Sequence, residues 1–127
     1  MTKSNFRGAA VLCNNSNELI CPHCREKYSY LHHDQVTVYS RDEDSPRVTK
    51  TVVRDHLAEI STIDNDTSGN PSSRRDGVAI RFWCELCHTI SELTFAQHKG
   101  VTQLEWRKIG RIAGNHFIVA EHIKRSA

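Results

Sequence analysis

The chain has 127 residues, 38% of them hydrophobic and 25% charged, with a formal net charge of +2. This length and a mean hydropathy of −0.54 fit one domain with a thin core, and they exclude a second independent core. The small net charge excludes a protein that would bind nucleic acid through its overall charge alone.

Residues 1–17 are rich in serine and asparagine and show neither a helical nor a strand period. They predict a flexible N-terminal arm that precedes a single domain at 18–127. The apolar run 9–13 in this arm is too short for a signal peptide or a membrane span. We therefore expect a cytoplasmic protein with reduced thiols and no membrane contact, in which Cys13 is a bystander.

Alternating β-branched and aromatic residues predict strands in the middle of the chain. The segment 28–41 is strand-like, and the polar run 42–46 indicates a turn. The segment 48–63 favours a strand, with a helical turn or two over 54–60 as the alternative. Glycine, asparagine, proline and serine gather in 64–77, which predicts a long loop.

The second half of the chain predicts more strands and one helix. Apolar residues alternate over 78–83, which indicates a strand that runs into the second cysteine pair. The segments 90–96 and 101–106 predict a hairpin, because Gly100 suits the left-handed position of the connecting turn. A short helix is expected over 116–124.

Four of the five cysteines form two Cys-x-x-Cys pairs, Cys21 with Cys24 and Cys84 with Cys87, separated by 59 residues. A two-residue spacing places both thiols on one tight turn, and two such turns supply the four thiolates of a structural zinc site. A thioredoxin-like redox pair is the alternative for either turn alone, but it requires a βαβ context. We predict one structural Zn²⁺ ion, bound by these four cysteines and closed to water.

These cysteine turns and the surrounding strands resemble the zinc-ribbon (zinc β-ribbon) superfamily and are similar to small zinc-ribbon proteins of bacteria and their phages. One departure is Arg25, where many ribbons have glycine after the second cysteine. The resemblance implies a mainly β fold: a zinc ribbon with a long β-rich insertion between its two CxxC knuckles and a short C-terminal helix. It also implies, by analogy of fold, nucleic-acid binding or a protein contact.

Charge is distributed unevenly. Residues 41–66 contain seven acidic and four basic side chains, whereas 99–127 contain six basic and two acidic ones. This asymmetry indicates a basic face, with an ordinary solvated surface as the alternative. Trp83 and Trp106 are candidate stacking partners for bases, although tryptophans at strand positions are more often core residues. The predicted nucleic-acid-binding residues are Arg74, Arg75, Arg81, Lys99, Arg107, Lys108 and Arg111.

Histidines raise the question of catalysis. The pair Asp55-His56 lies between the cysteine turns, as an Asp-His pair does in HNH nucleases, but the nearest preceding asparagine, Asn70, is 14 residues ahead of Cys84. We therefore expect a non-enzymatic, zinc-stabilised module that binds nucleic acid and has no small-molecule substrate. The alternatives are a protein-interaction adaptor of a phage or mobile element and, less favoured, an HNH-like metal-dependent nuclease.

Overall fold

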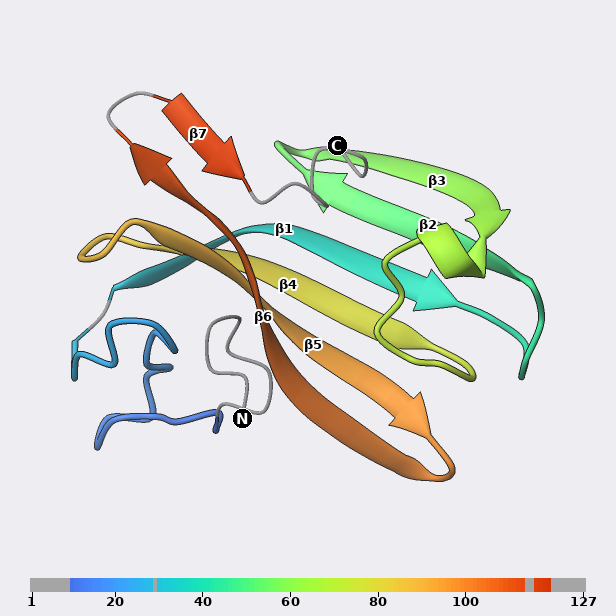
Figure 1. The fold of residues 1–127 in the computed structure, drawn as a ribbon, viewed down its shortest axis with the longest axis horizontal. Helices are drawn as coiled ribbons and strands as arrows, with labels where there is room; N and C mark the ends of the chain where they lie inside the picture. The colour runs from blue at the N-terminus through green and yellow to red at the C-terminus, as the bar shows by residue number, and fades with distance from the viewer. Residues whose placement is uncertain (1–9, 29, 114–115, 120–127) are drawn as a thin grey trace. The chain divides into compact units, whose positions relative to one another are not determined.

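The computed structural model describes residues 10–28, 30–113 and 116–119, and in this part of the chain the fold is almost entirely β (Figure 1). The strands form one seven-stranded sheet in the order β3-β2-β1-β4-β5-β6-β7. The one helical element in the described residues is the 3₁₀ turn η2 (Asn65–Thr67). The mainly β prediction is thus confirmed. The strands are β1 (Leu31–Ser40), β2 (Arg47–Arg54), β3 (Leu57–Asp64), β4 (Gly77–Cys84), β5 (Thr89–His98), β6 (Val101–Ala113) and β7 (His116–Val119).

The chain divides into two compact units. The first comprises Met1–His33, Arg81–Leu93 and Glu105–Ala127, and the second comprises Asp34–Ile80 and Thr94–Leu104. Strands β1, β4, β5 and β6 each contribute residues to both units. The first unit contains both cysteine pairs, and the second contains the β2–β3 hairpin and the long loop.

Two hairpins turn through only two residues each. Asp55 and His56 connect β2 to β3 with φ of 53° and 68°, and Lys99 and Gly100 connect β5 to β6 with φ of 50° and 84°. Two successive left-handed residues match the right-handed twist of the flanking strands. The hairpin predicted around Gly100 is confirmed. The segment predicted over 48–63 is two strands, so the helical alternative for 54–60 is wrong.

The long loop between β3 and β4 is held together by hydrogen bonds of its own polar side chains. The side-chain Nδ2 of Asn70 donates to Asn65 Oδ1 and to the carbonyl of Arg75, both at 2.9 Å. The Oδ1 of Asn70 accepts from the backbone amide of Ser72. Ser72 Oγ donates to the carbonyl of Gln97 at 2.6 Å. The predicted loop is therefore present, and Ser72 connects it to β5.

Each unit has its own buried residues. In the second unit Tyr39, Val48 and Ala79 form a small apolar cluster with Ile63 packed against it. In the first unit Trp106 is completely buried, and the ring of Phe82 meets it edge-on with 5.8 Å between centroids. Trp106 is therefore a core residue and is not available to stack on a nucleic-acid base.

The two ends of the described chain contain additional pairing. A bridge joins Cys13 to Leu19, and the side-chain Nδ2 of Asn14 donates to Glu18 Oε1 at 2.9 Å. At the other end, His116–Val119 pairs with β6 as strand β7, where the sequence predicted the start of a helix. The rest of that predicted helix, 120–124, lies outside the described residues.

Candidate metal centre

The two cysteine turns have the same backbone structure. The amide of Arg25 donates to the carbonyl of Cys21 at 3.0 Å, and the amide of His88 donates to the carbonyl of Cys84 at 2.9 Å. Arg25 and His88 are both left-handed, with φ of 56° and 64°. This conformation favours glycine, the residue that many zinc ribbons have at the position corresponding to Arg25. The turn forms with Arg25 in this position nevertheless.

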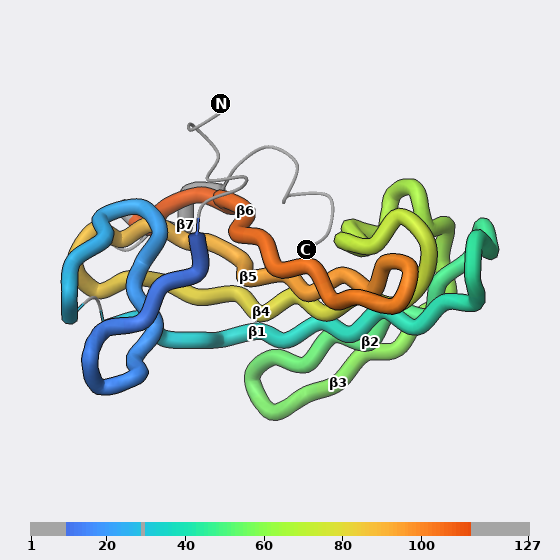
Figure 2. The backbone as a smooth tube through the Cα atoms, turned by 90° about the horizontal axis from the view of Figure 1, so that it is seen from below, coloured from blue at the N-terminus to red at the C-terminus, as the bar shows by residue number. Residues whose placement is uncertain are grey.

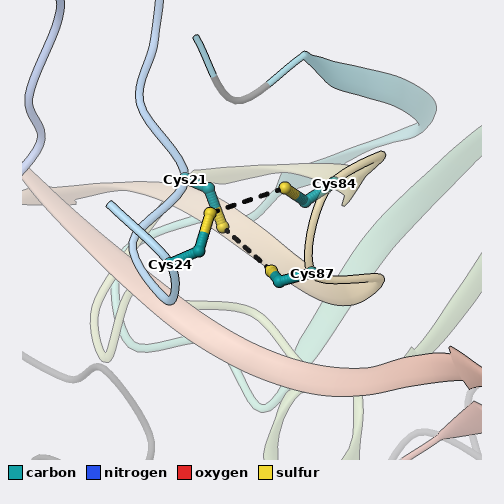
Figure 3. Close-up of side chains that lie close together, drawn as sticks. All are labelled: Cys21, Cys24, Cys84 and Cys87. Carbon is teal, nitrogen blue, oxygen red and sulfur yellow. Dashed lines mark hydrogen bonds between the residues drawn. The ribbon is translucent and has the colours of Figure 1, made fainter. Parts of the chain in front are cut away.

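The four sulfur atoms converge on one point between the turns (Figure 3). Cys21 Sγ lies 3.7 Å from Cys87 Sγ, Cys24 Sγ lies 3.8 Å from Cys84 Sγ, and all four lie within 4.8 Å of one another. A tetrahedron with Zn–S bonds of about 2.3 Å has sulfur–sulfur edges of about 3.8 Å. The four cysteines are therefore placed to hold one metal ion, as the sequence predicts.

Burial sets the proton affinity of these thiols. Cys21 and Cys84 are completely buried, and burial raises the pKa of both above the ordinary value of 9.0. The amide of His23, 3.4 Å from Cys21 Sγ, favours the thiolate but does not offset burial. Burial also opposes ionisation of Cys87, but hydrogen bonds from the Thr89 hydroxyl and amide lower its pKa below 9.0. A bound cation would favour the ionised form of all four thiols together.

A histidine from β1 supports the second turn. The ring of His32 stacks on Trp83 with 4.2 Å between centroids, and its Nε2 lies 2.7 Å from Glu85 Oε2. The amide of Glu85, inside the turn, donates to the carbonyl of Tyr30 at 3.3 Å. These contacts join residues more than 50 positions apart, so no sequence signal could have indicated them.

Three of the predicted nucleic-acid-binding residues are bound to other parts of the protein. Arg81 is 9% exposed, Arg74 forms an ion pair with Glu43, and Arg107 Nη2 lies 2.8 Å from Glu92 Oε1. The other four are accessible to different degrees: Arg75, Lys99 and Arg111 are exposed, and Lys108 is half-buried. Arg74, Arg75 and Lys99 belong to the second unit, and Arg81, Arg107, Lys108 and Arg111 to the first.

The histidine clusters do not form a second metal centre in the described part of the chain. Among those residues, the four cysteines are the one group of three or more His, Cys, Asp and Glu side chains placed to share an ion. Asp55 and His56 are exposed in the β2–β3 turn. Their left-handed backbone gives this pair a role in the turn.

Two further findings bear on identity. Within the described residues, no helix has the length and apolar character needed to cross a membrane. Comparisons of the chain with protein-family models, with curated proteins and with solved structures gave no match. The four-cysteine cluster is therefore the observation on which a functional assignment depends.

Proposed function

We propose that the protein is a non-enzymatic module of zinc-ribbon type, in which Cys21, Cys24, Cys84 and Cys87 bind one structural Zn²⁺ ion, and that its ligand is nucleic acid. The observation that carries the zinc assignment is the approach of four thiols to within 4.8 Å of one another. Soft thiolates in a tetrahedral set are the ligands of structural zinc, and four of them leave no coordination position open for water or substrate.

The metal would supply stability that the thin core does not. It would join segments that are 59 residues apart in the sequence and that contribute few large buried side chains. Structural Zn²⁺ sites in small domains contribute about 10–16 kcal/mol of apparent binding free energy, which is coupled to folding. Zinc is thus proposed to act on folding, and any ligand is bound elsewhere on the protein.

The nucleic-acid proposal is supported by the exposed cations Arg75, Lys99 and Arg111. Guanidinium groups form paired hydrogen bonds with phosphate oxygens, and lysine contributes a mobile positive charge. Because Arg74, Arg81 and Arg107 have protein neighbours or are buried, we assign the phosphate contacts of each unit to its own exposed cations: Arg75 and Lys99 in the second unit, and Arg111 in the first.

The test is a fluorescence-anisotropy titration of zinc-loaded protein against short single- and double-stranded DNA and RNA, with Mg²⁺ present and at several salt concentrations. For three phosphate contacts we expect the logarithm of affinity to fall with the logarithm of salt concentration with a slope of about −2 to −3. Each of Arg75→Ala, Lys99→Ala and Arg111→Ala should reduce that slope by roughly 0.7–0.9. Arg54→Ala removes an exposed arginine from the β2–β3 hairpin and serves as the matched control.

Two outcomes would contradict the proposal. No binding at low salt would exclude nucleic acid as the ligand. Cleavage of the oligonucleotides that depends on Asp55 and His56 would exclude a non-enzymatic role and favour the HNH-like alternative.

A protein-interaction adaptor is the second candidate, and one observation favours it. Leu57 and Ile60 on β3 are 71% and 72% exposed, which is unusual for large apolar side chains of a sheet. Binding through such residues would depend little on salt, so the same titration with a protein ligand separates the two functions.

A further inference from the structure

One face of the β1–β2–β3 sheet is uncharged over most of its length, and its one ion pair among the paired residues, Arg47 with Asp64, lies at the end of β2 and β3. In antiparallel strands, residues directly opposite each other project to the same face. The registers place Val36 opposite Val53, Val38 opposite Thr51, and Ser40 opposite Thr49, and β3 continues these rows. We call this surface the outer face; its members are Val36, Val38, Ser40, Thr49, Thr51, Val53, Ala58, Ile60 and Thr62.

The outer face is exposed in this structure. Val38, Val53 and Ile60 are 42%, 44% and 72% exposed, whereas Tyr39 and Val48, which project to the opposite face, are buried. Figure 2 shows β3 beside β2 on the side away from β1. A continuous exposed surface of this kind typically marks an interaction site.

Strand β3 also has a free edge. It is the last strand of the sheet among the strands that the structure describes, and seven of its eight residues are exposed. Natural proteins block such edges with proline, lysine, bulges or very short strands. β3 is eight residues long and contains no proline, glycine, lysine or arginine. The Thr62 carbonyl accepts a hydrogen bond from Arg47 Nη2 at 2.8 Å, and no strand of the described residues pairs with the other edge-facing N–H and C=O groups of β3.

We propose that β3 pairs antiparallel with β3 of a second copy of this chain about a two-fold axis. Successive residues of a strand direct their N–H and C=O groups alternately to the two sides, so every second residue of β3 faces the free edge. Hydrogen-bonded pairs across the axis must join members of that same set. The outer faces of the two copies therefore continue into each other as one apolar surface on one side of the joined sheet.

The charged and apolar side chains of β3 together favour one register. Centring the axis on Glu59 places two carboxylates directly opposite each other, which is unfavourable. Centring it on Ser61 leaves the apolar Leu57 without an opposite residue. Centring it on Ile60 pairs Ile60 with its counterpart, Leu57 with Ile63 and Glu59 with Ser61, so no like charges meet. Self-complementarity in this register is why a second copy is the partner that fits this edge.

The mass of the zinc-loaded protein in solution, measured by size exclusion with light scattering over a range of concentrations, tests the proposal. We expect a species of twice the 14.5 kDa mass of one chain. Ile60→Lys places two lysines opposite each other at the axis and should shift the protein to monomer. Val38→Lys makes the same change on the outer face but on β1, and it should leave the dimer intact.

A pair of double variants tests the register itself. In the proposed dimer Ala58 lies opposite Thr62 of the partner subunit, and both positions are exposed. Ala58→Lys with Thr62→Lys should dissociate the dimer, whereas Ala58→Lys with Thr62→Glu should preserve it through two ion pairs. Circular dichroism would confirm that each variant is folded.

A wild-type protein that remains monomeric at every concentration overturns the proposal, as does a dimer that Ile60→Lys leaves intact. Equal behaviour of the two double variants overturns the register. The proposal is independent of nucleic-acid binding, so the failure of either leaves the other standing.

Discussion

The guanidinium of Arg107 is bound to a buried carboxylate: its Nη2 lies 2.8 Å from Glu92 Oε1, and Glu92 is only 7% exposed. β5 and β6 bring the two residues together inside the first unit. A cation that charge distribution alone would assign to a nucleic-acid surface thus neutralises an interior charge. Burying an ionised carboxylate without such a partner is strongly unfavourable.

We therefore expect Arg107→Ala to destabilise the protein. The substitution leaves the Glu92 carboxylate buried without its cation, which should lower the free energy of unfolding by about 1–3 kcal/mol. Urea denaturation measures the change. Arg111→Ala, on the same strand but exposed, is the matched control and should change stability by less than about 0.5 kcal/mol. A stable Arg107→Ala protein with weakened nucleic-acid affinity would instead place Arg107 on the binding surface.

Loss of one metal ligand should unfold the first unit. Cys84 is completely buried and its sulfur lies 3.8 Å from that of Cys24, so Cys84→Ser removes one of the four thiols that we propose bind zinc. We expect the zinc content to fall from one ion per chain towards zero and the thermal transition to be lost or strongly lowered. Cys13→Ser changes an exposed cysteine outside the cluster and should alter neither quantity.

Chelation provides the same test without mutation. Removal of zinc, verified by elemental analysis, should abolish the β signal in circular dichroism. Adding zinc back should restore that signal. An unchanged spectrum after verified removal would show that the fold does not depend on the metal.

Metal binding should release protons. The ordinary pKa of a cysteine thiol is 9.0, and burial raises the pKa of Cys21 and Cys84 further, so both thiols are protonated at neutral pH without metal, whether the chain is folded or not, whereas zinc-bound sulfur is deprotonated. Acid therefore favours the metal-free state, and the stability of the loaded protein should fall as pH decreases. Calorimetric zinc titrations in buffers of different ionisation enthalpy should give at least two protons released per ion near neutral pH. Zero protons released would contradict protonated thiols.

A substitution in the β2–β3 turn should make the protein more stable. His56 has a φ of 68°, which favours glycine, and an Asn-Gly pair is the preferred sequence for a turn with two left-handed residues. Replacing Asp55-His56 with Asn-Gly should raise the free energy of unfolding by up to about 1 kcal/mol. His33→Gly, within strand β1, is the control and should lower it instead.

Replacing Gly77 should destabilise the protein, because residues of the long loop pack closely against it. A methyl group added there would lie 2.7 Å from the ring of Pro71 and would also collide with the side chain of Asn70. Gly77→Ala should therefore cost about 1–3 kcal/mol, because the hydrogen bonds of Asn70 must shift. Gly100→Ala, whose added methyl group would contact no atom within 4 Å, isolates the cost of the left-handed backbone alone.

Local patterns in the sequence were enough to predict most of the strands, the Lys99–Gly100 turn and the two cysteine turns, but not the Asp55–His56 turn or strand β7, where a helix was expected to begin. Each cysteine turn and the Lys99–Gly100 hairpin depends on residues within a few positions of one another, and local backbone preferences act at that range. Alternation of apolar residues was enough to predict the strand that became β4 and the β-rich character of the chain.

The tertiary structure alone decided which charges are available and which faces are covered. The partner of Arg107 and the stacking of His32 on Trp83 depend on strand pairing between distant segments, which charge counts along the chain do not encode. The same holds for β3, because its exposure follows from its position at the end of the sheet and not from its composition. Strand order depends on the sum of many long-range contacts. It decides whether a residue lies in the core, forms an ion pair or lies on an exposed edge strand.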